Sequence, residues 1–572
     1  MTRFALLAAL CLCGTLSAAT LTVTNLNDSG AGSLRQACID AASGDTVVFQ
    51  PGLAGVVTFA AGQIDLGAKA LTIIGNADVS GAPAITLNGN QATRLLNTGA
   101  ALSLDTLALY QGYAIGNLGG AINSTSAVIC TGCVFLANYA GIGGGAIFQS
   151  GMSGTVTCTG CTFEANLVNS GYGGAIVAVG NVVCSDCLFS QNYFGSSGDG
   201  GAIYQNSFGH TVTCTDCTFY SNLALNDYTT PSTGNGGAIY CTGDGITCTG
   251  CTFYANIAVG SGGAIWAQTY GVSCTDCTFS ANNGIGRCIY TASAQVTITN
   301  SIVADQYTGG WMFFNGGGAT FTSGGYNICT ASAVDVPWMN ATGDQVSTDP
   351  MLGPLQDNGG PVPTMRPLVG SPAIDKGGAS VTTTDARGYG RPADDSAIAN
   401  ATGGDGRDIG AVEFEIPEIM LLRDGVEVVD GGGDNAYGAA GTAISRVFTI
   451  RNDGFATLNI GAITFSNQSN CTVTASAAPA ATLAHAATTT FTLEITPSAA
   501  GPFSFDLQIA SDDTGKNPYN VHIVGNATRA SGGNNGDDDE SGCTTGDQRA
   551  IAWLVLTVFT LLAALKRHRR QA

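Results

Sequence analysis

The sequence predicts an all-β protein: a right-handed parallel β-helix, then a β-sandwich, then a C-terminal transmembrane segment. One block recurs six times between residues 119 and 285, at intervals of 25, 29, 27, 36 and 26 residues. That period, without helical periodicity, is typical of a β-solenoid coil. Residues 416–528 contain stretches in which apolar and polar residues alternate, as in sandwich strands. Residues 550–565 form an apolar run that precedes a basic cluster.

Composition excludes several functional classes. The chain has 572 residues, of which 81 are Gly, and 41 acidic residues against 20 basic ones give a net charge of −21. This charge excludes a nucleic-acid binder that works through a basic patch. Twenty cysteines with only four histidines argue against multiple Cys/His zinc sites. A hydrophobic share of 45% supports packed cores rather than disorder.

Residues 1–19 have the pattern of a secretory signal peptide. Arg3 supplies the positive charge, residues 4–16 form a short apolar core, and Ser17, Ala18 and Ala19 supply small residues before the cleavage site. We therefore expect the mature chain to be exported.

Residues 20–118 are expected to form the N-terminal cap and the first coils. Strands at 20–24 and 45–49 flank a helix at 33–42, where Ser33 and Gln36 form a capping box. The end of a solenoid exposes unpaired strand edges, and we interpret this helix as their cover.

Residues 119–345 carry the repeats. Each of the six blocks contains Gly-Gly-Ala-Ile, then Cys-x-x-Cys, then Phe-x-x-Asn. In a parallel β-helix, equivalent residues stack about 4.8 Å apart. We expect Ile and Phe to form inward apolar columns and Asn to form an amide ladder. The Phe-x-x-Asn tetrads begin at Phe135, Phe163, Phe189, Phe219, Phe253 and Phe279 and end at Asn138, Asn166, Asn192, Asn222, Asn256 and Asn282.

Together, these repeated Gly-Gly-Ala-Ile and Phe-x-x-Asn motifs resemble the passenger repeats of chlamydial polymorphic outer-membrane proteins. The resemblance covers residues 119–285 and implies a bacterial surface β-helix. The strand-helix-strand opening at residues 20–49 is similar to the start of many bacterial β-helix surface proteins.

Residues 346–415 resemble the "choice-of-anchor" module that ends many bacterial β-helix proteins. The resemblance rests on four ordered motifs in 349–355, 357–361, 370–375 and 408–413. It implies that this segment is the end of the β-helix, just before an anchoring signal. Its Asp residues could bind Ca²⁺, although solvated Asp beside Gly in turns is the preferred interpretation.

The C-terminal part is expected to hold the chain at a membrane. Residues 416–528 resemble an immunoglobulin-like spacer module, and 529–549 form an acidic, Gly-rich linker that contains Cys543. Residues 550–565 are a transmembrane or sorting helix, and 566–572 are a basic cytoplasmic tail. The order resembles three-part sorting signals, which makes Cys543 a candidate processing site; a plain single-pass anchor is the alternative.

The twelve cysteines of the repeats are the main candidate site residues. An oxidising compartment favours disulfides, either within a pair or between stacked coils. A ladder of unpaired, buried thiols is the alternative, and metal or redox chemistry is disfavoured because six stacked copies do not form one exposed reactive pair. The residues are Cys130, Cys133, Cys158, Cys161, Cys184, Cys187, Cys214, Cys217, Cys248, Cys251, Cys274 and Cys277.

The third position of the Cys-x-x-Cys motif is Asp in three coils and Gly in three. Asp186 and Asp216 lie in neighbouring coils, and two carboxylates about 5 Å apart would suit a retaining glycosidase. Exchange between Gly and Asp is, however, typical of a left-handed turn position, which is the preferred interpretation. We therefore assign no catalytic, cofactor-binding or metal-binding residue.

These observations predict an exported cell-surface protein, anchored or processed at its C-terminus, with an adhesive or structural role. Surface glycans or proteins of host or neighbouring cells are the expected partners, along with the membrane, and no nucleic acid or cofactor is expected. The alternative is a carbohydrate-active β-helix enzyme, a polysaccharide lyase or glycoside hydrolase. Carboxylates converging in a groove would favour the enzyme, whereas scattered carboxylates and a flat polar face would favour the binder.

Overall fold

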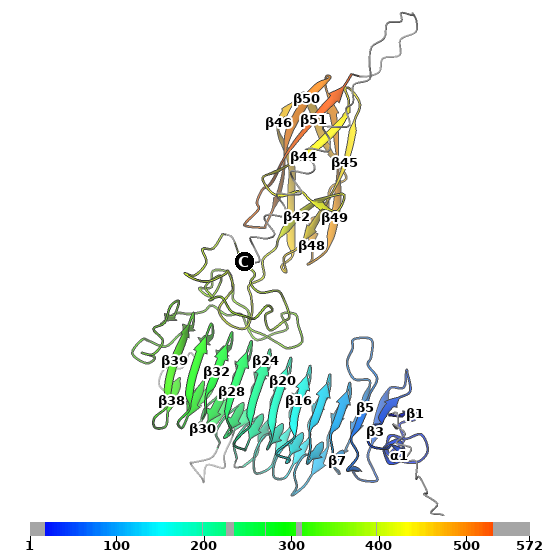
Figure 1. Ribbon diagram of the computed structural model, residues 1–572, viewed down its shortest axis with the longest axis vertical. Helices are drawn as coiled ribbons and strands as arrows, with labels where there is room; N and C mark the ends of the chain where they lie inside the picture. The colour runs from blue at the N-terminus through cyan, green and yellow to red at the C-terminus, as the bar shows by residue number, and fades with distance from the viewer. Residues whose placement is uncertain are drawn as a thin grey trace, which may run out of the picture.

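A computed structural model describes residues 18–196, 198–224, 234–268, 270–304, 312–395 and 397–529. Four parallel sheets wind into one β-helix (Figure 1), and each full coil contributes one strand to each sheet in turn. The predicted parallel β-helix is confirmed, while its right-handedness stays a prediction.

The two longest sheets run the whole length of the helix with 12 strands each. Sheet 1 contains β1 (Thr20–Val23), β2 (Thr46–Phe49), β5 (Leu71–Ile74), β8 (Leu102–Asp105), β12 (Val128–Thr131), β16 (Thr155–Thr159), β20 (Asn181–Ser185), β24 (Thr211–Thr215), β28 (Gly245–Thr249), β32 (Val272–Thr275), β36 (Gln295–Thr299) and β39 (Thr320–Gly325). Sheet 2 contains β3 (Gly55–Thr58), β6 (Ile85–Asn88), β9 (Ala108–Tyr110), β13 (Val134–Leu136), β17 (Thr162–Glu164), β21 (Leu188–Ser190), β25 (Thr218–Tyr220), β29 (Thr252–Tyr254), β33 (Thr278–Ser280), β37 (Ile302–Ala304), β40 (Ile328–Cys329) and β41 (Gln345–Val346).

The two shorter sheets complete the coils. Sheet 3 contains β10 (Tyr113–Ala114), β14 (Tyr139–Ala140), β18 (Leu167–Val168), β22 (Tyr193–Phe194), β26 (Leu223–Ala224), β30 (Ile257–Ser261) and β34 (Asn283–Ile285). Sheet 4 contains β4 (Ile64–Gly67), β7 (Leu96–Thr98), β11 (Ile122–Ser124), β15 (Ile147–Gln149), β19 (Ile176–Ala178), β23 (Ile203–Gln205), β27 (Ile239–Cys241), β31 (Ile265–Ala267), β35 (Ile289–Thr291) and β38 (Phe313–Asn315).

The repeats stack in register, as their period predicts. The six Phe residues of Phe-x-x-Asn are fully buried and form one column, with successive ring centroids 4.7–4.9 Å apart. The Asn residues form the expected amide ladder, in which Asn138 Nδ2 donates to Asn166 Oδ1 over 2.9 Å. Each rung adds buried apolar area and satisfied hydrogen bonds, so the repetition itself stabilises the core.

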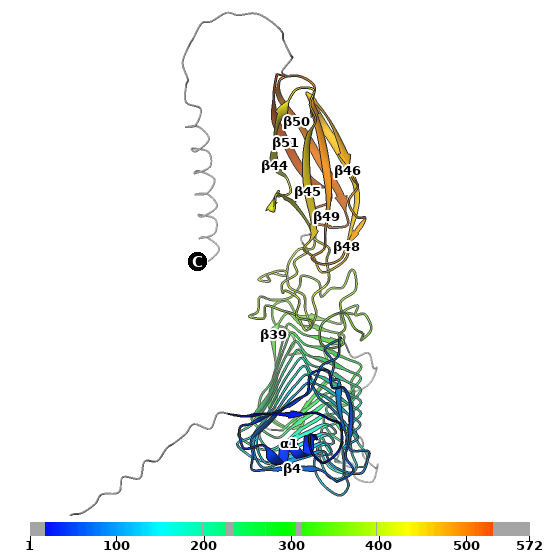
Figure 2. The same ribbon diagram turned by 90° about the vertical axis from the view of Figure 1, so that its right-hand side faces the viewer.

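Helix α1 (Leu34–Asp40) covers the N-terminal end of the β-helix (Figure 2). It buries Leu34, Ala37 and Cys38, and the Ser33 side chain accepts a hydrogen bond from the Gln36 amide. The capping box is only half formed, because the Gln36 side chain donates to Asp40 instead of accepting from Ser33. The predicted cap is therefore present, with one of its two predicted hydrogen bonds.

The sequence predicts that residues 346–415 form the end of the β-helix. In the structure, residues 347–415 add no further coils. They fold back over the outer face of sheet 2, where the Thr218 hydroxyl donates to the Pro363 carbonyl over 2.7 Å and the Ala411 amide donates to the Thr278 hydroxyl over 3.1 Å. Figure 1 shows this segment between the β-helix and the last module. We call residues 347–415 the side segment.

The last module is a sandwich of two five-stranded sheets over one apolar core. One sheet contains β42 (Ile419–Arg423), β43 (Val426–Glu427), β45 (Ile444–Asn452), β47 (Cys471–Ser476) and β49 (Thr488–Pro497). The other contains β44 (Gly432–Ala439), β46 (Leu458–Ser469), β48 (Thr482–Leu483), β50 (Gly501–Ser511) and β51 (Tyr519–Thr528). The resemblance of this sandwich to immunoglobulin-like modules stays a prediction.

Several predictions concern the two ends of the chain. The signal peptide up to residue 17, the linker from residue 530, Cys543, the apolar run 550–565 and the basic tail lie outside the described residues. Within the described ranges, no helix is long and apolar enough to cross a membrane.

Candidate functional site: the cysteine ladder and the faces of the β-helix

The cysteines of the repeats lie inside the β-helix in two adjacent columns. The first cysteine of each pair belongs to sheet 1, where Cys130 pairs in register with Cys158, and Cys158 with Cys184. All twelve are at most 1% exposed and all are free thiols. The prediction of disulfides is therefore wrong for this structure, and the alternative, a stacked thiol ladder, is what the structure contains.

Hydrogen bonds explain how the second thiols are held. The Cys161 thiol donates to the carbonyl of Thr159 and to that of Cys130 in the preceding coil, both at 3.4 Å. The Cys187 thiol makes the equivalent contacts with Ser185 at 3.1 Å and Cys158 at 3.4 Å. Each of these thiols therefore satisfies backbone carbonyls at the turn between sheets 1 and 2.

Burial keeps these thiols away from solvent, but their protonation differs along the ladder. Burial and hydrogen bonds donated to neighbouring thiols raise the pKa of Cys217 and Cys277 well above the ordinary value. Hydrogen bonds with neighbouring thiols instead lower the pKa of Cys274 to about 6 and also lower the pKa of Cys161. Because a redox-active thiolate must also be accessible and all twelve thiols are at most 1% exposed, the ladder is poorly suited to redox catalysis. In the described ranges, no group of three or more His, Cys, Asp or Glu side chains could hold a metal ion.

The turn between the paired cysteines has a left-handed backbone, as the Gly/Asp exchange predicts. Asp186, Asp216 and Asp276 have φ angles of 55°, 50° and 55°, and Gly132 and Gly160 have 56° and 59°. Asp tolerates this conformation better than most residues because its short side chain bonds locally.

One of the turn carboxylates, that of Asp276, contacts the side segment. Asp276 is fully buried and accepts hydrogen bonds from Asn300 at 2.5 Å and Thr382 at 2.8 Å, and its carboxylate lies 3.8 Å from the Arg391 guanidinium. Burial, followed by Cys251 and Asp186, raises the pKa of Asp216 to about 8. Asp276 therefore helps to hold the side segment on the β-helix.

Sequence reasoning missed the cation in this network. Within residues 110–330, Arg287 is the only basic residue apart from His210. The side segment brings Arg391 to the turn, where it also pairs with Glu413 at 2.5 Å and donates to the Asp408 and Gly410 carbonyls. No local signal links Arg391 to Asp276, because 115 residues separate them.

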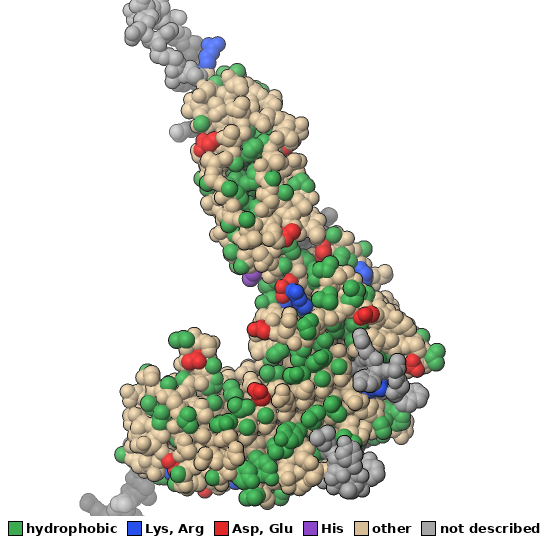
Figure 3. Space-filling view, turned by 180° about the vertical axis from the view of Figure 1, so that it is seen from behind, with side chains coloured by type: hydrophobic (Ala, Val, Ile, Leu, Met, Phe, Trp, Pro, Cys, Tyr) green, Lys and Arg blue, Asp and Glu red, His purple; other side chains and the backbone are tan. Residues whose placement is uncertain are grey.

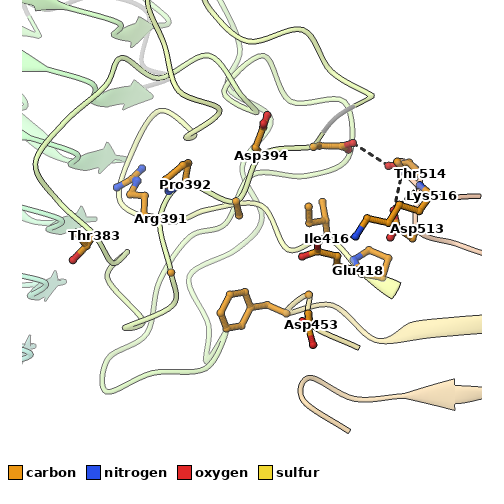
Figure 4. A pocket seen from close by; sticks show the side chains of 17 residues that line it. Thr383, Arg391, Pro392, Asp394, Ile416, Glu418, Asp453, Asp513, Thr514 and Lys516 are labelled. Atoms are coloured by element: carbon orange, nitrogen blue, oxygen red, sulfur yellow. Dashed lines mark hydrogen bonds and ion pairs between the residues drawn. The ribbon is translucent and has the colours of Figure 1, made fainter. Parts of the chain in front are cut away.

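A cavity of about 570 Å³ lies where the side segment meets the sandwich (Figure 4). Several acids line it, and two of them have partners that also line the cavity. The Thr514 hydroxyl donates to Asp395 over 2.9 Å, and Lys516 pairs with Glu418 at 3.0 Å. The cavity is therefore part of the connection between two modules.

The outer face of sheet 1 carries two columns of hydroxyl side chains, which sequence reasoning did not single out. The strands of this sheet lie side by side in Figure 1. The signal is a Thr-Cys-Thr pattern around the first cysteine of three of the six pairs, with Ser-Cys-Thr in a fourth and Cys pointing inward. The middle column is Thr20, Thr46, Thr72, Ser103, Ile129, Thr157, Val183, Thr213, Thr247, Ser273, Thr297 and Thr322. The second column includes Asp105, Thr131, Thr159, Ser185, Thr215, Thr249, Thr275 and Thr299.

Sheet 4 carries a different outer column, which is aromatic in the later coils. Tyr204, Tyr240, Trp266, Tyr290 and Phe314 stack face to face, with centroid distances between 4.1 and 6.0 Å. Each ring face is covered by its neighbours, so mainly ring edges are left for contact with a partner. On the face shown in Figure 3, acidic side chains are scattered among neutral ones.

Comparison with known proteins identifies one repeat. The model of the Chlamydia polymorphic membrane protein repeat matches residues 216–242, which include Phe219, Asn222 and one Gly-Gly-Ala-Ile. No curated protein matches the sequence. Among solved structures, the secreted serine protease VesC from Vibrio cholerae aligns with 13% identity over 16% of this chain and 21% of its own length, with a TM-score of 0.15 that supports no argument. The chain is a parallel β-helix protein that contains a repeat of the Chlamydia polymorphic membrane protein type.

Proposed function

We propose that this protein is an exported surface protein whose β-helix is a stable shaft for adhesion or for envelope structure. The observation that carries the proposal is the in-register helix itself. A match to a membrane-protein repeat and an outer face of sheet 1 without charged side chains in its two columns from β12 to β36 support it. The sandwich serves as an immunoglobulin-like spacer, and residues 530–572 anchor the chain or direct its processing near Cys543.

A carbohydrate-active enzyme is the less favoured function. The carboxylates that sequence reasoning considered for catalysis are turn residues, and the side segment covers Asp276. General acid–base hydrolysis of a glycan needs carboxylates that reach a bound sugar. We therefore assign no catalytic residue, and the repeat match also favours a non-enzymatic surface protein.

Protease shaving of intact cells tests the surface location. The full-length chain should be digested from outside, whereas a cytoplasmic control protein stays intact. A variant that lacks residues 530–572 should leave the cell fraction with its β-helix folded. Full protection of the full-length chain in intact cells would contradict the proposal. Cells that express the chain should also adhere differently from cells that lack it.

A further inference from the structure

The outer face of sheet 1 is a two-dimensional lattice of small hydroxyl side chains. Neighbouring strands lie about 4.8 Å apart, and the two columns are separated by about 6.7 Å, twice the rise per residue. Pairing stays in register from β8 to β36, and a shift occurs only where Ile298 and Thr299 meet β39. Over twelve strands, the lattice is about 50 Å long.

The chemistry of the lattice is uniform. Between Ile129 and Thr299 the two columns hold no charged side chain, although the whole chain carries a net charge of −21. Ten of the twelve residues in the middle column are Thr or Ser, and the other two, Ile129 and Val183, are β-branched. Each Thr offers one hydroxyl and one methyl group, and its β-branched side chain is restricted at χ1.

The interior keeps this lattice rigid. In the coils from β12 to β32 the residue between the two columns is an inward cysteine, fully or almost fully buried. The cysteines stack in register directly beneath the hydroxyl columns, so the backbone that carries Thr213 and Thr215 is fixed by packing below it.

Strand propensity alone does not explain the pattern. β-branched and aromatic residues all suit an exposed strand, and the equivalent coils of sheet 4 use Val177, Tyr204, Tyr240 and Trp266. Sheet 2 presents Leu188 and Ile302 among its threonines. Sheet 1 alone among these three keeps small hydroxyl residues in both columns through four consecutive coils, those of β24, β28, β32 and β36.

We propose that the outer face of sheet 1 binds the surface of ice. A periodic, uncharged array of hydroxyl and methyl groups gains most from a partner with the same period, and hexagonal ice repeats at nearly these two distances on its prism faces. Many weak contacts on one rigid lattice add up, because all of them form in a single binding event. From β12 to β36, the two columns offer no charged side chain that could pair with a charged polymer. The partner is therefore an uncharged solid.

Crystalline polysaccharide is the competing uncharged solid. Aromatic side chains offer broad, flat apolar surfaces with a polar handle and are common at binding surfaces. The rings of sheet 4, however, cover one another's faces. Sheet 1 carries no aromatic residue in either column from β8 to β36, so it offers no such surface to a polysaccharide. The inference rests on the proposed surface function only for its biological setting, because ice binding is tested on the purified chain.

Growth of a single ice crystal in a solution of the fluorescently labelled full-length protein tests the proposal. The label should enter the ice, and the protein should inhibit ice recrystallisation. Thr159→Lys and Thr247→Lys place a long cation on the lattice at exposed positions and should weaken inhibition at least tenfold. Thr162→Lys, the same change on the outer face of sheet 2, should leave it unchanged.

Exclusion of the wild-type protein from ice would overturn the proposal, whether or not a variant folds. Circular dichroism should show that all three variants are folded. If they then inhibit ice recrystallisation equally, the assignment of the ice-binding face to sheet 1 is wrong. Binding to insoluble cellulose or chitin that Thr247→Lys abolishes, without binding to ice, would replace ice by a crystalline glycan. None of these results affects protease shaving, so failure here is distinguishable from failure of the surface location.

Discussion

The Asn192 side-chain amide donates to the Asn222 side-chain carbonyl over 2.9 Å, and the same amide donates to the Phe163 carbonyl over 2.9 Å. The Asn192 carbonyl oxygen accepts from the backbone and side-chain amides of Asn166. One fully buried side chain thus joins three coils, and every polar atom of its amide group has a partner.

Replacing Asn192 by Leu should lower the free energy of unfolding by at least about 3 kcal/mol. The change leaves two donors of Asn166 buried without their acceptor and removes the side-chain donor to the Phe163 carbonyl, and each unsatisfied donor costs about 1–3 kcal/mol. Urea unfolding followed by circular dichroism measures the effect. Asn435→Leu, at an exposed position of β44, is the control, and a loss no larger than that of the control would contradict the ladder's role.

The Phe column makes a second prediction. Phe189 stacks between Phe163 and Phe219 at centroid distances of 4.8 Å and has no exposed surface. Phe189→Ala should cost about 3–5 kcal/mol, because it removes a buried ring and leaves a cavity. Phe208→Ala is the matched control, since Phe208 is 63% exposed and should tolerate the change. Similar melting temperatures for the two variants would argue against a packed column.

The β-helix could be predicted because its information is periodic. Six copies of one motif place Phe135 above Phe163 and Asn138 above Asn166 once the coil is assumed, and the left-handed turn follows from Gly132 and Asp186 at the same position. No long-range contact had to be guessed, because each coil contacts the next.

The side segment could not be placed in the same way. Its contacts join Thr382 to Asp276 and Ala411 to Thr278, over more than a hundred residues, and no repeat marks the partners. The disulfide prediction failed for a different reason. A Cys-x-x-Cys spacing gives the separation along the chain, but not whether a thiol such as Cys161 points at a sulfur or at a carbonyl.

The thiol ladder predicts a specific pattern of reactivity. In the native protein at pH 8, the twelve repeat cysteines should react slowly with an aromatic disulfide reagent, because each is at most 1% exposed and burial blocks access of the reagent. After unfolding without reductant, all twelve should react. Reductant-treated protein is the control, and a clear increase in the number of reactive thiols after reduction would restore the disulfide interpretation.

Because the pKa of Asp216 is raised, replacing this residue by Asn should change how the free energy of unfolding depends on pH. The pKa is about 8 in the folded protein against an ordinary value of 3.8, so the folded state binds this proton more tightly than the unfolded state. The contribution of Asp216 to stability is then fully present below pH 4 and is lost as pH rises towards 8. Asp216→Asn removes the titration and keeps a residue that tolerates a φ of 50°.

Asp216→Asn should therefore be more stable than the wild type at pH 8 and nearly equal to it at pH 4. Thermal unfolding across this range measures the difference. Asp424→Asn is the control, because Asp424 has a φ of 51° but is exposed. A constant difference between Asp216→Asn and the wild type from pH 4 to pH 8 would contradict the assignment.

Arg391 makes the last prediction, which concerns how the side segment is held. Its guanidinium is almost fully buried, 3.8 Å from Asp276 on the β-helix and 2.5 Å from Glu413 in the side segment. Arg391→Met keeps the length of the side chain but leaves both carboxylates buried without their cation, which costs about 3–5 kcal/mol. Residues 347–415 should loosen first, because the coils keep their own ladders, so limited proteolysis should cut this segment while the β-helix remains intact.

Arg451→Met is the control: it removes an exposed ion pair with Asp453 and should change stability by less than about 1 kcal/mol. Equal protease resistance of Arg391→Met and the wild type would show that the hydrogen bonds of Thr218 and Thr278 hold the side segment without the ion pairs.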